Sequence, residues 1–201
     1  MSSSFKGDNM KYLVILSILA VCYSGTYAAG EDALTVIHNR KSVRNFTGVP
    51  ATRAELEKIV KAGMAAPSAV NKQPWSFVIV TDLKALDALA AALPYARMLS
   101  KAGSAIVVCA IPEKAYENSK DFAVIDCSCA SENILLAAEA LGLGAVWTAA
   151  YPDKDRMEVV RKALNIPANI IPLNVIPVGH PTGTDKPKDK FKKENIHWQK
   201  W

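Results

Sequence analysis

Two short segments of this chain carry the residues best suited to chemistry. The first, Arg40 to Arg44, reads R-K-S-V-R. Arginine stays charged at physiological pH, its planar guanidinium can pair with two phosphate oxygens, and the serine hydroxyl adds another donor. A single R-x-S-x-R segment is also common in solvated surface loops. On its own it is therefore a weak indicator of a phosphate site.

The second segment, Ala65 to Trp75, reads A-A-P-S-A-V-N-K-Q-P-W. Pro67 ends the preceding helix because proline has no N–H and its ring clashes with the previous turn. Pro74 fixes the entry to the following strand. Between the prolines lie three side chains that can hydrogen-bond a flat ligand with polar edges: Ser68, Asn71 and Gln73. Taken together, the two segments predict a cofactor site.

The sequence does not indicate a nucleophile or a metal. It contains no Walker loop, G-x-G-x-x-G fingerprint, G-x-S-x-G elbow or H-E-x-x-H segment. The three histidines lie far apart with no neighbouring carboxylate pattern, which disfavours a metal site and a general base. Cys127 and Cys129 would face different sides of a helix, so packing is the better interpretation for both. We therefore expect no protein catalytic group and no metal, and assign the chemistry to a cofactor.

The charge distribution argues against nucleic acid as a partner. The formal charge is +5 and the isoelectric point is about 9.0, but the basic residues are spread along the chain without interleaved aromatic platforms. Lys188 and Lys190 belong to a C-terminal cluster that alternates with acidic residues. We weigh a phosphate-binding role for these two lysines equally against a solvated charge run.

The segment from Ser119 to Leu141 is predicted to be a helix that is apolar nearly all round. A helix without a wide polar face is buried in the protein or in a subunit interface. Four polar residues interrupt it: Asp126, Glu132, Asn133 and Glu139. Because buried charges need partners, we expect mainly structural roles for them, with contact to a ligand or another subunit as the alternative.

Hydrophobic periodicity predicts the remaining elements. Thr52 and Glu55 form a capping box for a helix whose buried stripe is Leu56, Ile59, Val60 and Met64. Further helices are expected at 33–40, 82–93 and 153–164, and strands at 75–81, 105–110, 145–150 and 171–179. The prolines of the last strand predict an edge position or an irregular strand. The polar tail ends in tryptophans, which predicts that it lies against the body or a partner subunit.

The N-terminus resembles a secretory signal. A lysine precedes an apolar run from about Leu13 to Cys22, and Thr26-Tyr27-Ala28 supplies small residues for cleavage. We predict a signal peptide over residues 1–28, one domain over residues 29–201, and a periplasmic location. A retained membrane anchor and lipidation at Cys22 are weaker alternatives, and only these would bring the protein to a membrane. If the segment does not function, the location is cytoplasmic.

The chain resembles the nitroreductase family. The resemblance covers about Ala33 to Trp201 and rests on four ordered motifs: I-H-N-R-K-S-V-R-N-F, A-A-P-S-A-V-N-K-Q-P-W, D-C-S-C-A-S-E-N-I-L-L-A-A-E-A-L-G-L-G-A-V-W and V-G-H-P. It implies an α+β fold, with a mixed sheet flanked by helices, assembled as an intertwined homodimer. It also implies two FMN sites at the subunit interface.

The resemblance assigns roles to particular residues. Arg40 and Ser42, with Lys41 between them, would hold the FMN phosphate, and Arg44 would lie by the ribityl chain and the pyrimidine edge. The other subunit would supply four residues around the isoalloxazine: Pro67, Ser68, Ala69 and Asn71. Three residues would lie near the reactive N5 edge: Trp147, Thr148 and Ala149. At Lys190 the family often has arginine; lysine keeps the charge and loses the bidentate fork.

The implied activity is transfer of hydride from NADH or NADPH, through flavin N5, to a small acceptor such as a nitroaromatic or a quinone. Nicotinamide donors are scarce outside the cytoplasm, which conflicts with the predicted signal peptide. Two alternatives therefore remain. One is a flavin enzyme of the same fold that uses no nicotinamide donor, and the other is a non-catalytic FMN-binding protein.

Overall fold

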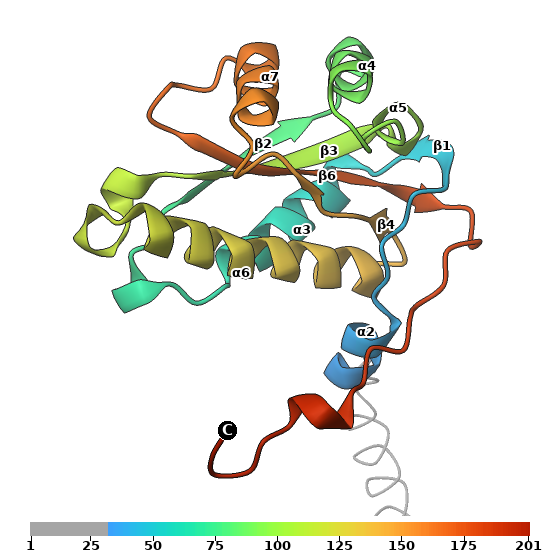
Figure 1. Ribbon diagram of the computed structural model, residues 1–201. Coiled ribbons are helices and arrows are strands. Elements are labelled where there is room, and N and C mark those ends of the chain that lie inside the picture. The colour runs from blue at the N-terminus through green and yellow to red at the C-terminus, as the bar shows by residue number, and fades with distance from the viewer. Residues whose placement is uncertain (1–31) are drawn as a thin grey trace, which may run out of the picture. The chain divides into compact units, whose positions relative to one another are not determined.

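An antiparallel sheet lies between two layers of helices in the computed structural model (Figure 1). The structure describes residues 32–201, and residues 33–201 cluster as one unit. The predicted signal peptide lies outside the described residues. Helices α3 and α6 cover one face of the sheet, and α4, α5 and α7 lie on the other (Figure 1). The predicted α+β class is therefore confirmed.

The sheet has the strand order β1-β6-β3-β2, and two short strands also pair with β6. The strands are β1 (Phe46–Pro50), β2 (Trp75–Val80), β3 (Ser104–Ala110), β4 (Gly144–Ala145), β5 (Thr148–Ala149) and β6 (Ile171–Pro181). Every pairing in the described chain is antiparallel. The expected mixed sheet is thus replaced by an antiparallel one, because β3 runs opposite to both of its neighbours, β2 and β6.

The prediction that the proline-bearing strand lies at an edge is wrong. Strand β6 pairs with β1, β3, β4 and β5. Pro172 lies beside a register shift in the ladder with β3. Pro177 falls between two short ladders, because β4 pairs only as far as Val178 and β5 only as far as Val175. The other alternative, an irregular strand, is confirmed, and the irregularity is how prolines are accommodated inside a sheet.

The predicted strand over 145–150 is two separate strands of two residues each. β4 ends at Ala145 and β5 begins at Thr148, and the ladders are interrupted by Val146 and Trp147. Val146 is buried and Trp147 packs against the core. The apolar run therefore marks residues that are buried, although they do not form one continuous strand. The sequence pattern alone does not distinguish these two cases.

The lower layer of Figure 1 contains α3 (Arg53–Met64) and α6 (Lys120–Ala140). The Thr52 hydroxyl accepts from the Glu55 N–H and the Glu55 carboxylate accepts from the Thr52 N–H, which confirms the capping box. Met64 was expected in the buried stripe but is 50% exposed. Gly63 takes the buried position, since an added Cβ there would lie 2.9 Å from Ile134 Cγ1 on α6.

The upper layer contains α4 (Leu83–Ala92), α5 (Leu99–Ala102) and α7 (Lys154–Leu164). Asp82 and Asp153 cap α4 and α7 as expected, each accepting a backbone N–H from the first turn. Leu86 and Leu89 enter the second core cluster, between these helices and the sheet. The larger cluster lies between the sheet and the α3–α6 layer.

The ends of the described chain are more exposed. Helix α2 (Ala33–Asn39) buries only Val36, and η4 (Lys193–Asn195) buries no residue. Trp198 and Trp201 are 79% and 102% exposed. The prediction that the tail packs these tryptophans against the body of the protein is therefore wrong. Contact with a partner subunit remains a prediction. Within residues 32–201, no helix is long and apolar enough to cross a membrane.

Candidate functional site

The segment from Arg40 to Arg44 is held by its central valine. Val43 is buried, and its N–H donates to the Ala145 carbonyl at 3.0 Å. A Cβ at Gly144 would approach the Val43 side chain to 2.6 Å, so this contact requires glycine. Val43 is directed into the core, while its neighbours Ser42 and Arg44 are exposed at the surface.

Two of the basic residues here form ion pairs with α6. Arg40 Nε lies 3.3 Å from Glu132 Oε1, and Lys41 Nζ lies 2.7 Å from Glu139 Oε1. The expected structural roles of the two glutamates are thus observed. Arg40 has further guanidinium donors to offer. The Lys41 ammonium is engaged by both oxygens of Glu139, so its predicted contact with phosphate would compete with this pair.

The sequence-predicted phosphate residues meet in one pocket of about 480 Å³. We call it the cationic pocket, and its lining residues are Arg40, Lys41, Ser42, Arg44, Thr184, Asp185, Lys186, Pro187, Lys188 and Lys190. The one acidic residue in this lining, Asp185, accepts the backbone N–H groups of Arg44 and Asn45. This contact brings the two predicted lysines of the C-terminal segment to the arginines. The resulting excess of cations suits a dianionic group.

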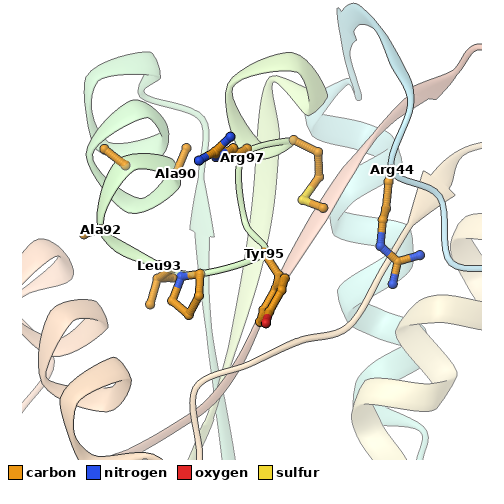
Figure 2. Close-up of a pocket in the computed structure, with 9 residues that line it drawn as sticks. Arg44, Ala90, Ala92, Leu93, Tyr95 and Arg97 are labelled. Atoms are coloured by element: carbon orange, nitrogen blue, oxygen red, sulfur yellow. The ribbon is translucent and has the colours of Figure 1, made fainter.

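A second pocket, of about 730 Å³, adjoins the first because Arg44 lines both. Its other polar walls are Tyr95 and Arg97, from the connection between α4 and α5. Figure 2 shows Arg44 and Tyr95 on separate segments beside this hollow. Sequence reasoning missed both residues of the connection. The available signal was weak, namely an arginine and a tyrosine after the L-P dipeptide that ends α4.

The segment Ser68–Gln73, which we call the strained loop, contains η1 (Ala69–Asn71). Val70, Asn71 and Gln73 have φ values of 41°, 58° and 52°. The left-handed region is costly for side chains other than glycine, and especially for a β-branched one. Side-chain contacts support this conformation: the Gln73 N–H donates to Ser68 Oγ at 2.9 Å, and Gln73 Nε2 donates to Asn71 Oδ1 at 3.0 Å.

Within one chain, the strained loop and the cationic pocket lie far apart. The loop is joined to α6 through Asp126, which accepts the Ala69 N–H, whereas Lys41 is joined to α6 through Glu139. Asp126 precedes Glu139 by thirteen positions, which is about 20 Å along the helix at ~1.5 Å per residue, and it precedes Glu132, the partner of Arg40, by six positions, which is about 9 Å. Figure 1 shows the two segments at opposite ends of α6.

The third predicted group lies at and before β5. Trp147 is half-buried against the core, and the Thr148 hydroxyl donates to the Val175 carbonyl. Ala149 pairs with Asn174 of β6. None of the three residues lines the cationic pocket. Asn174 is fully buried; its Nδ2 donates to Ser131 Oγ, and its Oδ1 has no hydrogen-bond partner among residues 32–201.

The described residues contain no metal cluster, and their two buried thiols are poorly suited to act as nucleophiles. Among residues 32–201, no cluster of three or more His, Cys, Asp or Glu side chains could hold a metal ion. Burial raises the pKa of Cys109 to about 12, and burial together with the neighbouring Asp126 carboxylate raises that of Cys127 further. Both thiols are therefore neutral at physiological pH, and the neutral form is a poor nucleophile.

Comparisons with known proteins agree with this geometry. A profile described as "Nitroreductase family" matches residues 37–94 and 90–180. A candidate NADH dehydrogenase/NAD(P)H nitroreductase from Archaeoglobus fulgidus is 42% identical over 174 residues, covering 85% of this chain and 99% of that protein.

Two solved structures extend the comparison. A candidate NADH dehydrogenase/NAD(P)H nitroreductase from Parabacteroides distasonis has a TM-score of 0.80 and 51% identity, covering 84% of this chain and 98% of that one. A candidate nitroreductase from Desulfovibrio desulfuricans, solved in complex with FMN, has a TM-score of 0.73 and 27% identity over 85% of this chain and 98% of that one.

Proposed function

This chain belongs to the nitroreductase family, and from that premise we propose that it is an FMN-dependent NAD(P)H oxidoreductase. Its relatives include an NADPH-dependent FMN reductase from Bacillus subtilis and an NADPH-flavin oxidoreductase from Vibrio harveyi. We propose a nitroaromatic or a quinone as the electron acceptor. We also propose which residues form the FMN site.

The cationic pocket is the observation that carries the proposal. Arg40, Ser42, Lys188 and Lys190 come from the two ends of the described chain and line one hollow. The positive charges of Arg40, Lys188 and Lys190, together with the Ser42 hydroxyl, fit the FMN phosphate. This phosphate is a dianion at neutral pH and accepts several hydrogen bonds. The donor set therefore fits the cofactor that the family implies.

When bound, FMN supplies the two-electron chemistry, taking hydride from NAD(P)H and passing it to the acceptor. The chain's own residues hold and tune it. Arg44 and Arg97 line the adjoining pocket, where fixed positive charges favour a ring that gains electrons. We propose that Tyr95 forms a wall for this ring, and that Trp147, Thr148 and Ala149 of another part of the sheet approach its N5 edge.

We further propose a homodimer, in which the strained loop of one chain completes the cationic pocket of the other. The strained loop and the segment from Arg40 to Arg44 lie at opposite ends of α6 (Figure 1), which is hard to reconcile with a site made by one chain. Helix α6 and the residue that follows it also expose apolar side chains: Ile125 is 57% exposed, and Phe122 and Leu141 are partly exposed. Contacts with a second copy would cover them, as they would cover the tryptophans of the tail.

The test is an absorbance spectrum of the purified protein reconstituted with FMN, followed by anaerobic addition of NADH and then NADPH. Prompt bleaching of the flavin band by either donor is the expected result. Addition of nitrofurazone or menadione should then restore the band. If no flavin binds, the assignment of the two motifs fails.

The same experiment separates the alternatives. A bound flavin that neither nucleotide reduces would indicate a flavin enzyme with a different donor. A flavin that no donor reduces would indicate a binding protein. Either outcome would be easier to reconcile with the periplasmic location that we propose for the chain from its N-terminal segment.

A further inference from the structure

Asp126 connects α6 to the strained loop. Its side chain is buried, with 4% of the residue exposed, and its Oδ1 accepts the Ala69 N–H at 3.1 Å. The next residue, Cys127, places its Sγ 3.6 Å from the Pro74 carbonyl. Two consecutive residues of α6 therefore contact the backbone at the two ends of this loop.

The loop needs such support because its backbone is strained. Ala69 precedes two residues in the left-handed region, Val70 and Asn71, and Gln73 is a third. Each left-handed residue other than glycine costs about 1 to 2 kcal/mol, so the surrounding contacts must hold the conformation. The contacts within the loop join Ser68, Asn71 and Gln73 to one another. Asp126 is the side chain from α6 that fixes the loop to the rest of the molecule by a charged hydrogen bond.

Stability alone does not account for a carboxylate at this position. Its second oxygen, Oδ2, is buried and has no partner among the described residues. A buried oxygen without a hydrogen bond is unfavourable, so burying this side chain offsets part of the stability that its bond to Ala69 contributes. An unfavourable group retained beside a strained loop is a common feature of functional sites.

We propose that Asp126 is a positioning residue: it holds the Ala69 N–H and thereby sets the shape that the strained loop presents to FMN. The inference rests on the proposed function for the identity of the ligand. The arrangement of the loop itself is a property of the flavin-free chain. The proposal therefore makes one prediction without flavin and another with it.

The first experiment uses the flavin-free protein and measures amide hydrogen exchange at Ala69 by NMR. Asp126→Ala removes the acceptor and should accelerate exchange about 10- to 100-fold, since a hydrogen bond to a charged group is lost. Asp126→Asn keeps an acceptor and should stay within about threefold of the wild type. Ser128→Ala, on the same helix, loses only a bond to the Val124 carbonyl and should leave Ala69 unchanged.

The proposal is overturned if Asp126→Ala leaves Ala69 exchange unchanged, or if Asp126→Asn is as impaired as Asp126→Ala. Should the alanine variant fail to fold, Asp126→Ser replaces it, because the serine side chain is too short to reach Ala69 yet keeps a polar atom. It should show the same acceleration.

The second experiment compares the variants loaded with FMN. Asp126→Ala should weaken FMN binding about 10-fold, as expected for one lost hydrogen bond of the positioned loop. It should also alter the visible circular dichroism and the midpoint potential of the flavin. A merely structural residue would lower the melting temperature and leave both flavin signals unchanged, which would overturn the proposal. If the wild type binds no FMN, the proposed function fails, while the exchange at Ala69 still tests the positioning contact.

Discussion

The ammonium of Lys41 lies 2.7 Å from a carboxylate oxygen of Glu139, and this pair joins the segment from Arg40 to Arg44 to the C-terminal end of α6. The two side chains are only 22% and 15% exposed. Because partly buried charges are weakly screened by solvent, each depends on the other. The pair therefore helps to place Arg40 and Ser42 at the wall of the cationic pocket.

Lys41→Met should lower the free energy of unfolding by about 1 to 3 kcal/mol, since it leaves the Glu139 carboxylate partly buried without its partner. Urea denaturation at pH 7 measures the change. The matched control is Lys162→Met, because Lys162 pairs with Glu158 on the surface of α7 with 76% of its side chain exposed. The control should change stability by less than about 0.5 kcal/mol. Equal effects of the two substitutions would show that the Lys41 pair is a surface pair.

Arg40→Ala should weaken FMN binding about 10- to 100-fold, because a charge-assisted hydrogen bond to the phosphate is lost. Riboflavin has the same ring and no phosphate, so its affinity should not change. Fluorescence titration measures both ligands. Arg53→Ala is a suitable control, since Arg53 pairs with Glu57 on α3 and does not line the cationic pocket. An equal loss for FMN and riboflavin would place Arg40 away from the phosphate.

Lys190→Arg should tighten FMN binding a few-fold. Arginine offers two parallel N–H donors where lysine offers a point charge, and Lys190 lines the cationic pocket. The affinity for FMN should also be more sensitive to salt in Lys190→Arg than in Lys190→Gln, which removes the charge. If all three residues at this position give the same affinity, the C-terminal segment does not contact the phosphate.

The protein should lose stability as the pH rises above about 8.5. Burial raises the pKa of Cys109 to about 12, so folding favours its neutral thiol. Below the pKa that the thiol has in the unfolded chain, it is protonated in both the folded and the unfolded state, and its contribution to stability is complete. Above that pKa the thiol ionises in the unfolded chain before it does in the folded protein, so the free energy of unfolding falls. Each such thiol adds a slope of at most about 1.4 kcal/mol per pH unit.

Urea denaturation at pH 7 and at pH 10 measures this dependence. Cys109→Ala should reduce the slope of the free energy of unfolding against pH by the contribution of one buried thiol. Val107→Ala is the control, because Val107 is a buried residue of the same strand and carries no ionisable group; it should leave the slope at that of the wild type. A slope that Cys109→Ala does not reduce would mean that the Cys109 thiolate is tolerated in the folded protein.

Local signals in the sequence predicted the elements well. Thr52 and Ser119 begin their helices as predicted because an N-cap acts within one turn of the chain. Position within the sheet was not predictable in this way. The prolines of β6 suggested an edge, but gaps between β4 and β5 accommodate Pro177 inside the sheet, and such gaps depend on residues distant in sequence.

The site was predictable only where a motif marks it. The resemblance indicated Arg40, Ser42 and Lys190, and the structure brings them to one pocket. Arg97 carries no motif, and its place in the pocket that Arg44 also lines depends on how the connection between α4 and α5 folds back. The contact from Asp126 to Ala69 was likewise hidden, because a single aspartate in an apolar helix does not indicate its partner.

In the dimer that we propose, one FMN site combines the cationic pocket of one chain with the strained loop of another. The most direct test is the FMN stoichiometry of a mixed dimer, made by co-expressing Arg40→Ala and Asn71→Ala chains with different affinity tags. Each variant alone should bind FMN weakly. The mixed dimer should bind one FMN tightly, because one of its sites receives both intact segments. If each site is made by a single chain, the mixed dimer will bind no FMN tightly, and that result would contradict the account.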